Sequence, residues 1–220
     1  MSFFKSFIPK RVSNELSLSF FELLRKMASH NFPNNLERNI ASFKNHIPTI
    51  EKNNGYIEDQ HNYSDMFYGN KTLSYCGCEI ISAFNALYDL TGDKNINLPM
   101  MINDFEKDGI VLSGQFGTSP KAIENYFTKN GFKTLSSCHL KDYDEIGEKC
   151  DALILTLYND RDNIFNMVHS INITKKDGQF YIHNNGGKYK SEVYKSITDI
   201  LTRINGGKSK DIFLIGIFKK

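Results

Sequence analysis

The spacing of apolar residues changes part-way along the chain. Through residue 131, apolar residues recur every three or four positions, which is typical of amphipathic helices. From residue 132 onward they form short runs rich in β-branched and aromatic residues, separated by Gly, Asn and Asp, which is typical of strands. Helices followed by strands predict an α+β fold, in which N-terminal helices pack on a mostly antiparallel sheet.

Capping residues mark the ends of the predicted helices. Ser13 suits the N-cap of the first helix, and Pro99 and Pro120 suit first turns. Gly92 and Gly109 suit helix ends. The predicted helices span residues 13–30, 34–47, 78–92, 98–109 and 119–131, and a further helix at 191–206 separates the last two strands.

The strand-like half contains one clear hairpin. Asp177 and Gly178 stand between two alternating runs, and this pair favours the tight turn of a β-hairpin. The predicted strands span residues 132–140, 152–158, 167–176, 179–184 and 211–219.

The chain has four cysteines, too few for a disulfide scaffold at this length, so each is considered as a thiol. Cys78 stands where the helix at 78–92 begins. A thiolate in a first helical turn is stabilised by the free N–H groups and the positive end of the helix dipole. The adjacent Gly77 allows a close backbone approach, which suits an oxyanion site built from the N–H of Cys78.

Two polar residues of the predicted hairpin complete a candidate catalytic set. His169 lies on its first strand and Asn184 at the end of its second, so the turn brings them side by side. A histidine base held by a hydrogen bond from an amide is the arrangement that a Cys-His-Asn site requires.

Structural roles explain each of these residues equally well when it is taken alone. Cys78 suits the buried start of a helix, and His169 suits a half-buried position on a strand. Asn184 suits a turn. The sequence Cys76-Gly77-Cys78 also suggests a metal or redox site. A zinc site normally needs a second pair of ligands, however, and Cys138 and Cys150 are distant and do not form one. The order Cys, His, Asn on a helix and two successive strands favours the catalytic interpretation.

These segments resemble a papain-like cysteine peptidase, and most nearly the compact bacterial branch that includes the double-glycine leader (bacteriocin-processing) peptidases. The resemblance rests on GCEIISAFNAL around Cys78, on DGIVLSGQFGTSPKAIENYF and on the HSINI…QFYIHN hairpin. Similar stretches occur in uncharacterised Firmicute proteins. The resemblance spans residues 66–219 and implies Cys78 as nucleophile, His169 as general base and then acid, and Asn184 as the group that orients the imidazole.

The resemblance also implies an oxyanion hole formed by the Cys78 N–H and an upstream polar side chain. The family usually has Gln six positions before its nucleophile, but here Thr72 occupies that position, and Gln60 lies too far back by sequence alone. Asn70 stands six positions before Cys76. We therefore keep Asn70 as the oxyanion candidate and Cys76 as the alternative nucleophile.

The resemblance implies hydrolysis of a peptide or amide bond through a thioester, with a peptide or protein substrate and without a cofactor. An acyltransferase on the same fold, or an inactive binding or assembly protein, is an alternative because a fold does not fix a function. Residues 61–220 form the expected catalytic domain, and residues 1–60 form an N-terminal helical segment that supports or extends it.

Charge and hydropathy exclude two classes of partner. The formal net charge is +2 and the cations are spread along the chain, so a nucleic-acid partner is not expected. The chain has neither a run of roughly 18 apolar residues nor a standard signal sequence. We therefore expect no membrane span and a cytoplasmic location.

Overall fold

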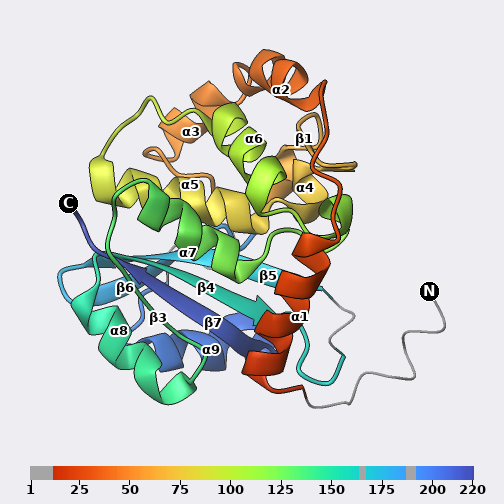
Figure 1. The fold of residues 1–220 in the computed structure, drawn as a ribbon. Coiled ribbons are helices and arrows are strands. Elements are labelled where there is room, and N and C mark those ends of the chain that lie inside the picture. The colour runs from red at the N-terminus through yellow and green to blue at the C-terminus, as the bar shows by residue number, and fades with distance from the viewer. Residues whose placement is uncertain (1–11, 164–166, 187–191) are drawn as a thin grey trace.

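The computed structural model describes residues 12–163, 167–186 and 192–220. Within these residues, a five-stranded antiparallel sheet has helices on both faces (Figure 1). Helices α5 and α7 lie over one face, and α8 and α9 cover the other. The predicted α+β class, with helices packed on an antiparallel sheet, is confirmed.

The helices have the following bounds: α1 (Asn14–Lys26), α2 (Asn35–Phe43), α3 (Ile47–Lys52), α4 (Leu73–Cys76), α5 (Cys78–Thr91), α6 (Leu98–Asp108), α7 (Pro120–Lys129), α8 (Tyr143–Lys149) and α9 (Ile197–Arg203). A short 3₁₀ helix, η2 (Gln60–Asn62), precedes a small hairpin of β1 (Phe67–Tyr68) and β2 (Lys71–Thr72). The main sheet consists of β3 (Thr134–Ser137), β4 (Ala152–Tyr158), β5 (Val168–Lys176), β6 (Gln179–His183) and β7 (Lys210–Ile217).

The strands of the main sheet lie in the order β3-β7-β4-β5-β6. All seven residues of the central strand β4 are buried, since helices cover both of its faces. Ile154 packs into the core beneath α5, whereas Leu153 and Leu155 pack into the core that α8 and α9 cover. This alternation builds two hydrophobic cores on opposite faces of one sheet.

The hairpin of β5 and β6 forms at its predicted turn. Lys176 pairs with Gln179, and Asp177 and Gly178 have φ values of 52° and 72°. Two positive φ values in a two-residue loop define a type I′ turn, whose twist matches that of the flanking strands. This hairpin carries both His169 and Asn184.

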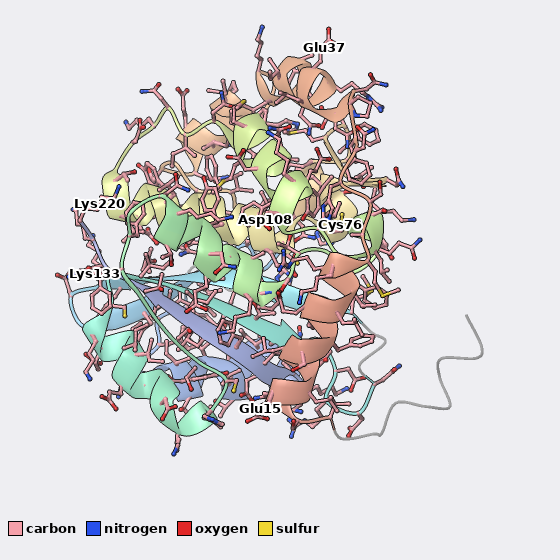
Figure 2. All side chains as sticks on the ribbon, viewed as in Figure 1. Glu15, Glu37, Cys76, Asp108, Lys133 and Lys220 are labelled. Carbon is pink, nitrogen blue, oxygen red and sulfur yellow. The ribbon has the colours of Figure 1, made fainter. Side chains whose placement is uncertain are left out.

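The N-terminal helices share a core with the rest of the chain. Phe21 of α1 belongs to the same hydrophobic core as α5 and the sheet. Tyr158 donates its hydroxyl hydrogen to Ser17 Oγ at 3.0 Å, and the Arg25 guanidinium donates to Asp108 Oδ1 at 2.9 Å. Figure 2 shows Asp108 near the C-terminal end of α1. The predicted boundary between residues 60 and 61 falls inside η2.

Some elements differ from their predicted extent. Helix α8 and the β1–β2 hairpin were not predicted, because each is too short to show a period. The helix expected at 191–206 is reduced to α9, beyond which Asn205 and Gly206 adopt positive φ, and residue 191 lies outside the described residues. No helix of the described residues is long and apolar enough to cross a membrane.

If α1 is part of the cooperative fold, Phe21→Ala should lower the free energy of unfolding by about 3 kcal/mol. Phe21 is 3% exposed, so truncation leaves a cavity in the shared core. Leu16→Ala is the matched control, since Leu16 lies on the same helix but is 54% exposed, and it should change stability by less than about 0.5 kcal/mol. Urea unfolding measures both. Equal, small effects would mean that α1 does not contribute to the core.

Candidate functional site

A tight junction between two helices places Cys78 at the first position of α5. Gly77 donates its N–H to the Leu73 carbonyl at 2.8 Å, and its own carbonyl accepts the N–H of Ile81 at 2.9 Å. A Cβ at position 77 would lie 2.4 Å from Leu73 Cδ1 and 2.6 Å from Leu73 O. The packing of Leu73 therefore requires glycine here, and Cys78 begins a new helix of 14 residues.

The Cys78 side chain is buried, with 4% of the residue exposed. Its S–H donates to Glu79 Oε2 at 3.1 Å, and the backbone N–H of Ser170 on β5 faces the sulfur. Burial, and then the nearby charge of Glu79, raises the pKa of the thiol well above its usual range. Cys78 is therefore a neutral thiol at pH 7 in this structure.

His169 on β5 makes a hydrogen bond that fixes its tautomer. Its Nε2 lies 2.8 Å from the backbone carbonyl oxygen of Asn184. A carbonyl oxygen only accepts, so Nε2 carries the hydrogen and Nδ1 keeps a free lone pair. Burial lowers the pKa of His169 to about 4, although the hydrogen bond to Asn184 opposes this shift. The imidazole is thus neutral at pH 7.

Asn184 connects the hairpin to two other segments. Its φ of 63° ends β6 in a left-handed conformation that Asn tolerates. Its Oδ1 accepts the N–H of Gln60 at 3.2 Å, and its Nδ2 lies 3.4 Å from the Cys78 carbonyl oxygen. The expected hydrogen bond from the side-chain amide to the imidazole is replaced by one to the backbone carbonyl of the same residue.

The structure gathers the backbone of Cys78, the side chain of Asn184 and the ring of His169 into one hydrogen-bonded cluster. In the part of the chain that the structure describes, however, no hydrogen bond joins the Cys78 sulfur to His169, because the thiol donates to Glu79. A neutral thiol and a neutral imidazole with no hydrogen bond between them differ from the thiolate–imidazolium pair of an activated Cys-His site.

Gln60 lies at this cluster although its sequence position argued against it. Besides its backbone bond to Asn184, its Oε1 lies 3.4 Å from Asn184 Nδ2, and its Nε2 donates to the Ser74 carbonyl at 3.1 Å. Spacing from Cys78 could not reveal it, because β1, β2 and α4 are inserted between η2 and α5.

Asn85 of α5 holds the segment that carries Gln60. Its Oδ1 accepts the N–H of Ile57 and its Nδ2 donates to the Ile57 carbonyl, both at 2.9 Å. On the other side of the segment, the ring of Tyr56 stacks on that of His183, with centroids 3.9 Å apart. These contacts fix residues 56–60 between α5 and β6.

Asn70 and Cys76 lie in a different environment from Cys78. Asn70 is exposed in the turn between β1 and β2, and its N–H donates to the Ser113 carbonyl at 3.0 Å. The Cys76 thiol donates to the Thr72 carbonyl at 3.4 Å, and burial raises its pKa. Figure 2 shows Cys76 within the helical layer. Among the described residues, no hydrogen bond links Asn70 or Cys76 to His169 or Asn184.

Glu79 is fully buried next to the thiol. Its carboxylate accepts the S–H of Cys78, and the backbone N–H of Thr118 faces it and favours its ionised form, while its Oε1 has no hydrogen-bond partner among the described residues. A Cβ on Gly117 would lie 2.7 Å from Glu79 Oε2. Burial raises the pKa of Glu79 to about 7. One carboxylate thus contacts both the thiol and the loop before α7.

Potential metal ligands gather at a separate surface position. Glu15 Oε1 lies 3.5 Å from His139 Nδ1 and 3.8 Å from Cys138 Sγ. Glu15 and His139 are exposed, and Figure 2 shows Glu15 well separated from Cys76. Within the described residues, no hydrogen bond or ion pair joins this group to His169 or Asn184.

No protein-family model and no curated protein matches this chain. A solved structure, described as the crystal structure of the peptidase domain of Streptococcus ComA, a bi-functional ABC transporter involved in a quorum-sensing pathway, is similar with a TM-score of 0.44. The similarity covers 65% of this chain and 91% of that chain at 13% identity. A likeness at this level assigns no activity to this chain.

The close contact of Gly117 with Glu79 predicts that Gly117→Ala is more destabilising than Gly92→Ala. Both glycines have positive φ, 68° and 65°, but no atom lies within 4 Å of a Cβ added at Gly92. The two substitutions therefore introduce similar backbone strain. The clash with Glu79 should lower the free energy of unfolding of Gly117→Ala by about 1–3 kcal/mol more than that of Gly92→Ala. Urea unfolding of the two variants measures the difference, and equal losses would show that the loop does not press on Glu79.

Proposed function

We propose that this protein hydrolyses a peptide or amide bond with Cys78 as nucleophile, His169 as general base and Asn184 as the residue that orients the imidazole. The observation that carries the proposal is the hydrogen-bonded cluster of these three residues at the N-terminus of α5. The free lone pair on His169 Nδ1 gives the cluster a base, and the first helical turn favours negative charge on sulfur.

The proposed reaction starts from the neutral pair. His169 Nδ1 accepts the thiol proton while Cys78 Sγ attacks the substrate carbonyl and forms a C–S bond. The tetrahedral intermediate then breaks its C–N bond, and the imidazolium gives the proton to the leaving amine. Water, deprotonated by the same imidazole, hydrolyses the thioester and restores the thiol.

Two N–H donors suit the oxyanion. The Cys78 N–H has no hydrogen-bond partner among the described residues, so it is free to donate to a substrate oxygen. We assign the second donor to the Gln60 amide, because one of its two hydrogens remains after the bond to Ser74. Asn70, the sequence candidate, is exposed in a turn held to Ser113 and suits this role less well.

A catalytically inactive binding protein is the second candidate function. The observation that favours it is the pairing of the Cys78 thiol with Glu79 instead of His169, together with the neutral state of both groups. An acyltransferase would form the same thioester and differ in the attacking nucleophile, which acid-base geometry does not distinguish.

Alkylation by iodoacetamide, followed by peptide mapping, tests whether His169 activates Cys78. We expect Cys78 to react faster than Cys150 below pH 8, although both are buried, because His169 Nδ1 accepts the proton. His169→Ala should reduce the rate at Cys78 by at least about tenfold and leave Cys150 unchanged.

The matched control is Cys76→Ser, which should preserve the rate at Cys78. Equal reactivity of Cys78 and Cys150, with no effect of His169→Ala in a folded protein, would exclude the enzyme and favour the binding protein. Fast alkylation of Cys76 in its place would exclude Cys78 as the nucleophile.

A further inference from the structure

Two sequence motifs far apart in the chain meet at Glu79. GCE at the start of α5 supplies the thiol and the carboxylate, and GTS before α7 supplies Gly117 and the Thr118 N–H. Gly117 approaches so closely that any side chain there would contact Glu79 Oε2. In the proposed reaction Cys78 is the nucleophile, whereas this carboxylate takes no part.

The geometry around the Cys78 sulfur holds its hydrogen away from His169. At 3.1 Å, the S–H donates to Glu79 Oε2, and a thiol has a single hydrogen to donate. Glu79 is 0% exposed and its Oε1 is buried without a partner in the described part of the chain, so this carboxylate keeps an unsatisfied acceptor in the interior. An unsatisfied buried acceptor is costly, and it persists where the surrounding structure imposes it.

We propose that Glu79 is a positioning residue that slows transfer of the Cys78 thiol proton to His169 by accepting the thiol hydrogen itself, and that movement of the Gly117–Thr118 backbone removes this restraint. The inference rests on the proposed function, since it concerns the same nucleophile. Because one carboxylate contacts both thiol and loop, a substrate that displaces the loop would also release the thiol hydrogen. The released proton then passes to His169 Nδ1 as the sulfur attacks.

The charge of Glu79 supports this role. Burial raises its pKa to about 7, so the carboxyl is largely protonated below pH 7 and ionised above it. The ionised Glu79 carboxylate raises the pKa of Cys78 by like-charge repulsion. It also raises the pKa of Cys76 of α4 and of Tyr68 of β1, which face it as well. From the loop before α7, the neutral Thr118 N–H faces the carboxylate.

The test is the rate of Cys78 alkylation by iodoacetamide in the full chain between pH 6 and pH 9, for wild type and Glu79→Gln. Gln keeps an acceptor for the Thr118 N–H and removes the charge. At pH 8 we expect Cys78 to be alkylated on the order of tenfold faster in Glu79→Gln than in wild type. Below pH 7, where wild-type Glu79 is protonated, the difference in rate between the two proteins should decrease.

Glu106→Gln is the matched control. Glu106 is also buried, and its Oε1 accepts hydrogen bonds from Asn35 and the Gly69 N–H, but no hydrogen bond of the described residues joins it to Cys78. The alkylation rate of Cys78 in Glu106→Gln should equal that in wild type. A folded Glu79→Gln protein with a wild-type or slower rate would overturn the proposal, because a purely structural carboxylate would not restrain the thiol.

A measurement on the wild-type protein covers the case in which Glu79→Gln fails to fold. With ¹³C-labelled glutamate, the Glu79 carboxyl should titrate near pH 7, and titration at the ordinary value of about 4.3 would overturn the proposal. His169→Ala separates the two claims. If it leaves the wild-type alkylation rate unchanged, the proposed function fails, whereas an unchanged rate in Glu79→Gln alone removes only the role of Glu79.

Discussion

The hydrogen bonds of Asn184 connect segments that are far apart in the sequence. Its backbone carbonyl fixes the His169 ring, its Oδ1 accepts the N–H of Gln60, and its Nδ2 lies against the Cys78 carbonyl. The residue is 0% exposed, so each unmade bond would leave a buried polar group without a partner. The relative positions of α5, η2 and the β5–β6 hairpin at the site depend on this satisfied amide.

The site combines nucleophilic residue types with an environment that keeps them neutral. Burial raises the pKa of Cys78 and lowers that of His169, and these shifts work against a charged pair. A neutral resting pair protects a buried thiol from adventitious oxidation, since the thiolate is the reactive form. In the proposed reaction, attack by Cys78 requires proton transfer in step with bond formation, so the rate depends on where the thiol hydrogen points.

Local patterns predicted the fold well where an element is long or has a strong turn. The helix from Cys78, its end at Gly92 and the turn at Asp177 and Gly178 all follow from residues within a few positions of each other. Helix α8 escaped prediction because seven residues with a central glycine show little period, and packing against the sheet stabilises it.

The candidate site was predictable only in part. Spacing suggested Cys78, His169 and Asn184, and the structure brings them into one cluster. Gln60 was missed because the β1–β2 hairpin and α4 intervene, so its position depends on tertiary bonds such as that of Asn85 to Ile57. The pairing of Cys78 with Glu79 was not foreseen either, since adjacent residues on a helix rarely face each other and the loop at Gly117, which packs closely on the carboxylate, is distant in the sequence.

The central claim is that Cys78 performs nucleophilic attack with the help of His169. A peptidyl acyloxymethyl ketone tests it most directly, because this probe labels a cysteine that attacks a carbonyl-activated centre within a formed oxyanion site. If Cys78 attacks with the help of His169, one label per chain should form, mapped to Cys78 and absent from His169→Ala. Two results would exclude this role of Cys78: labelling of no cysteine, or equal labelling of Cys78 and the half-buried Cys138 whether or not His169 is present.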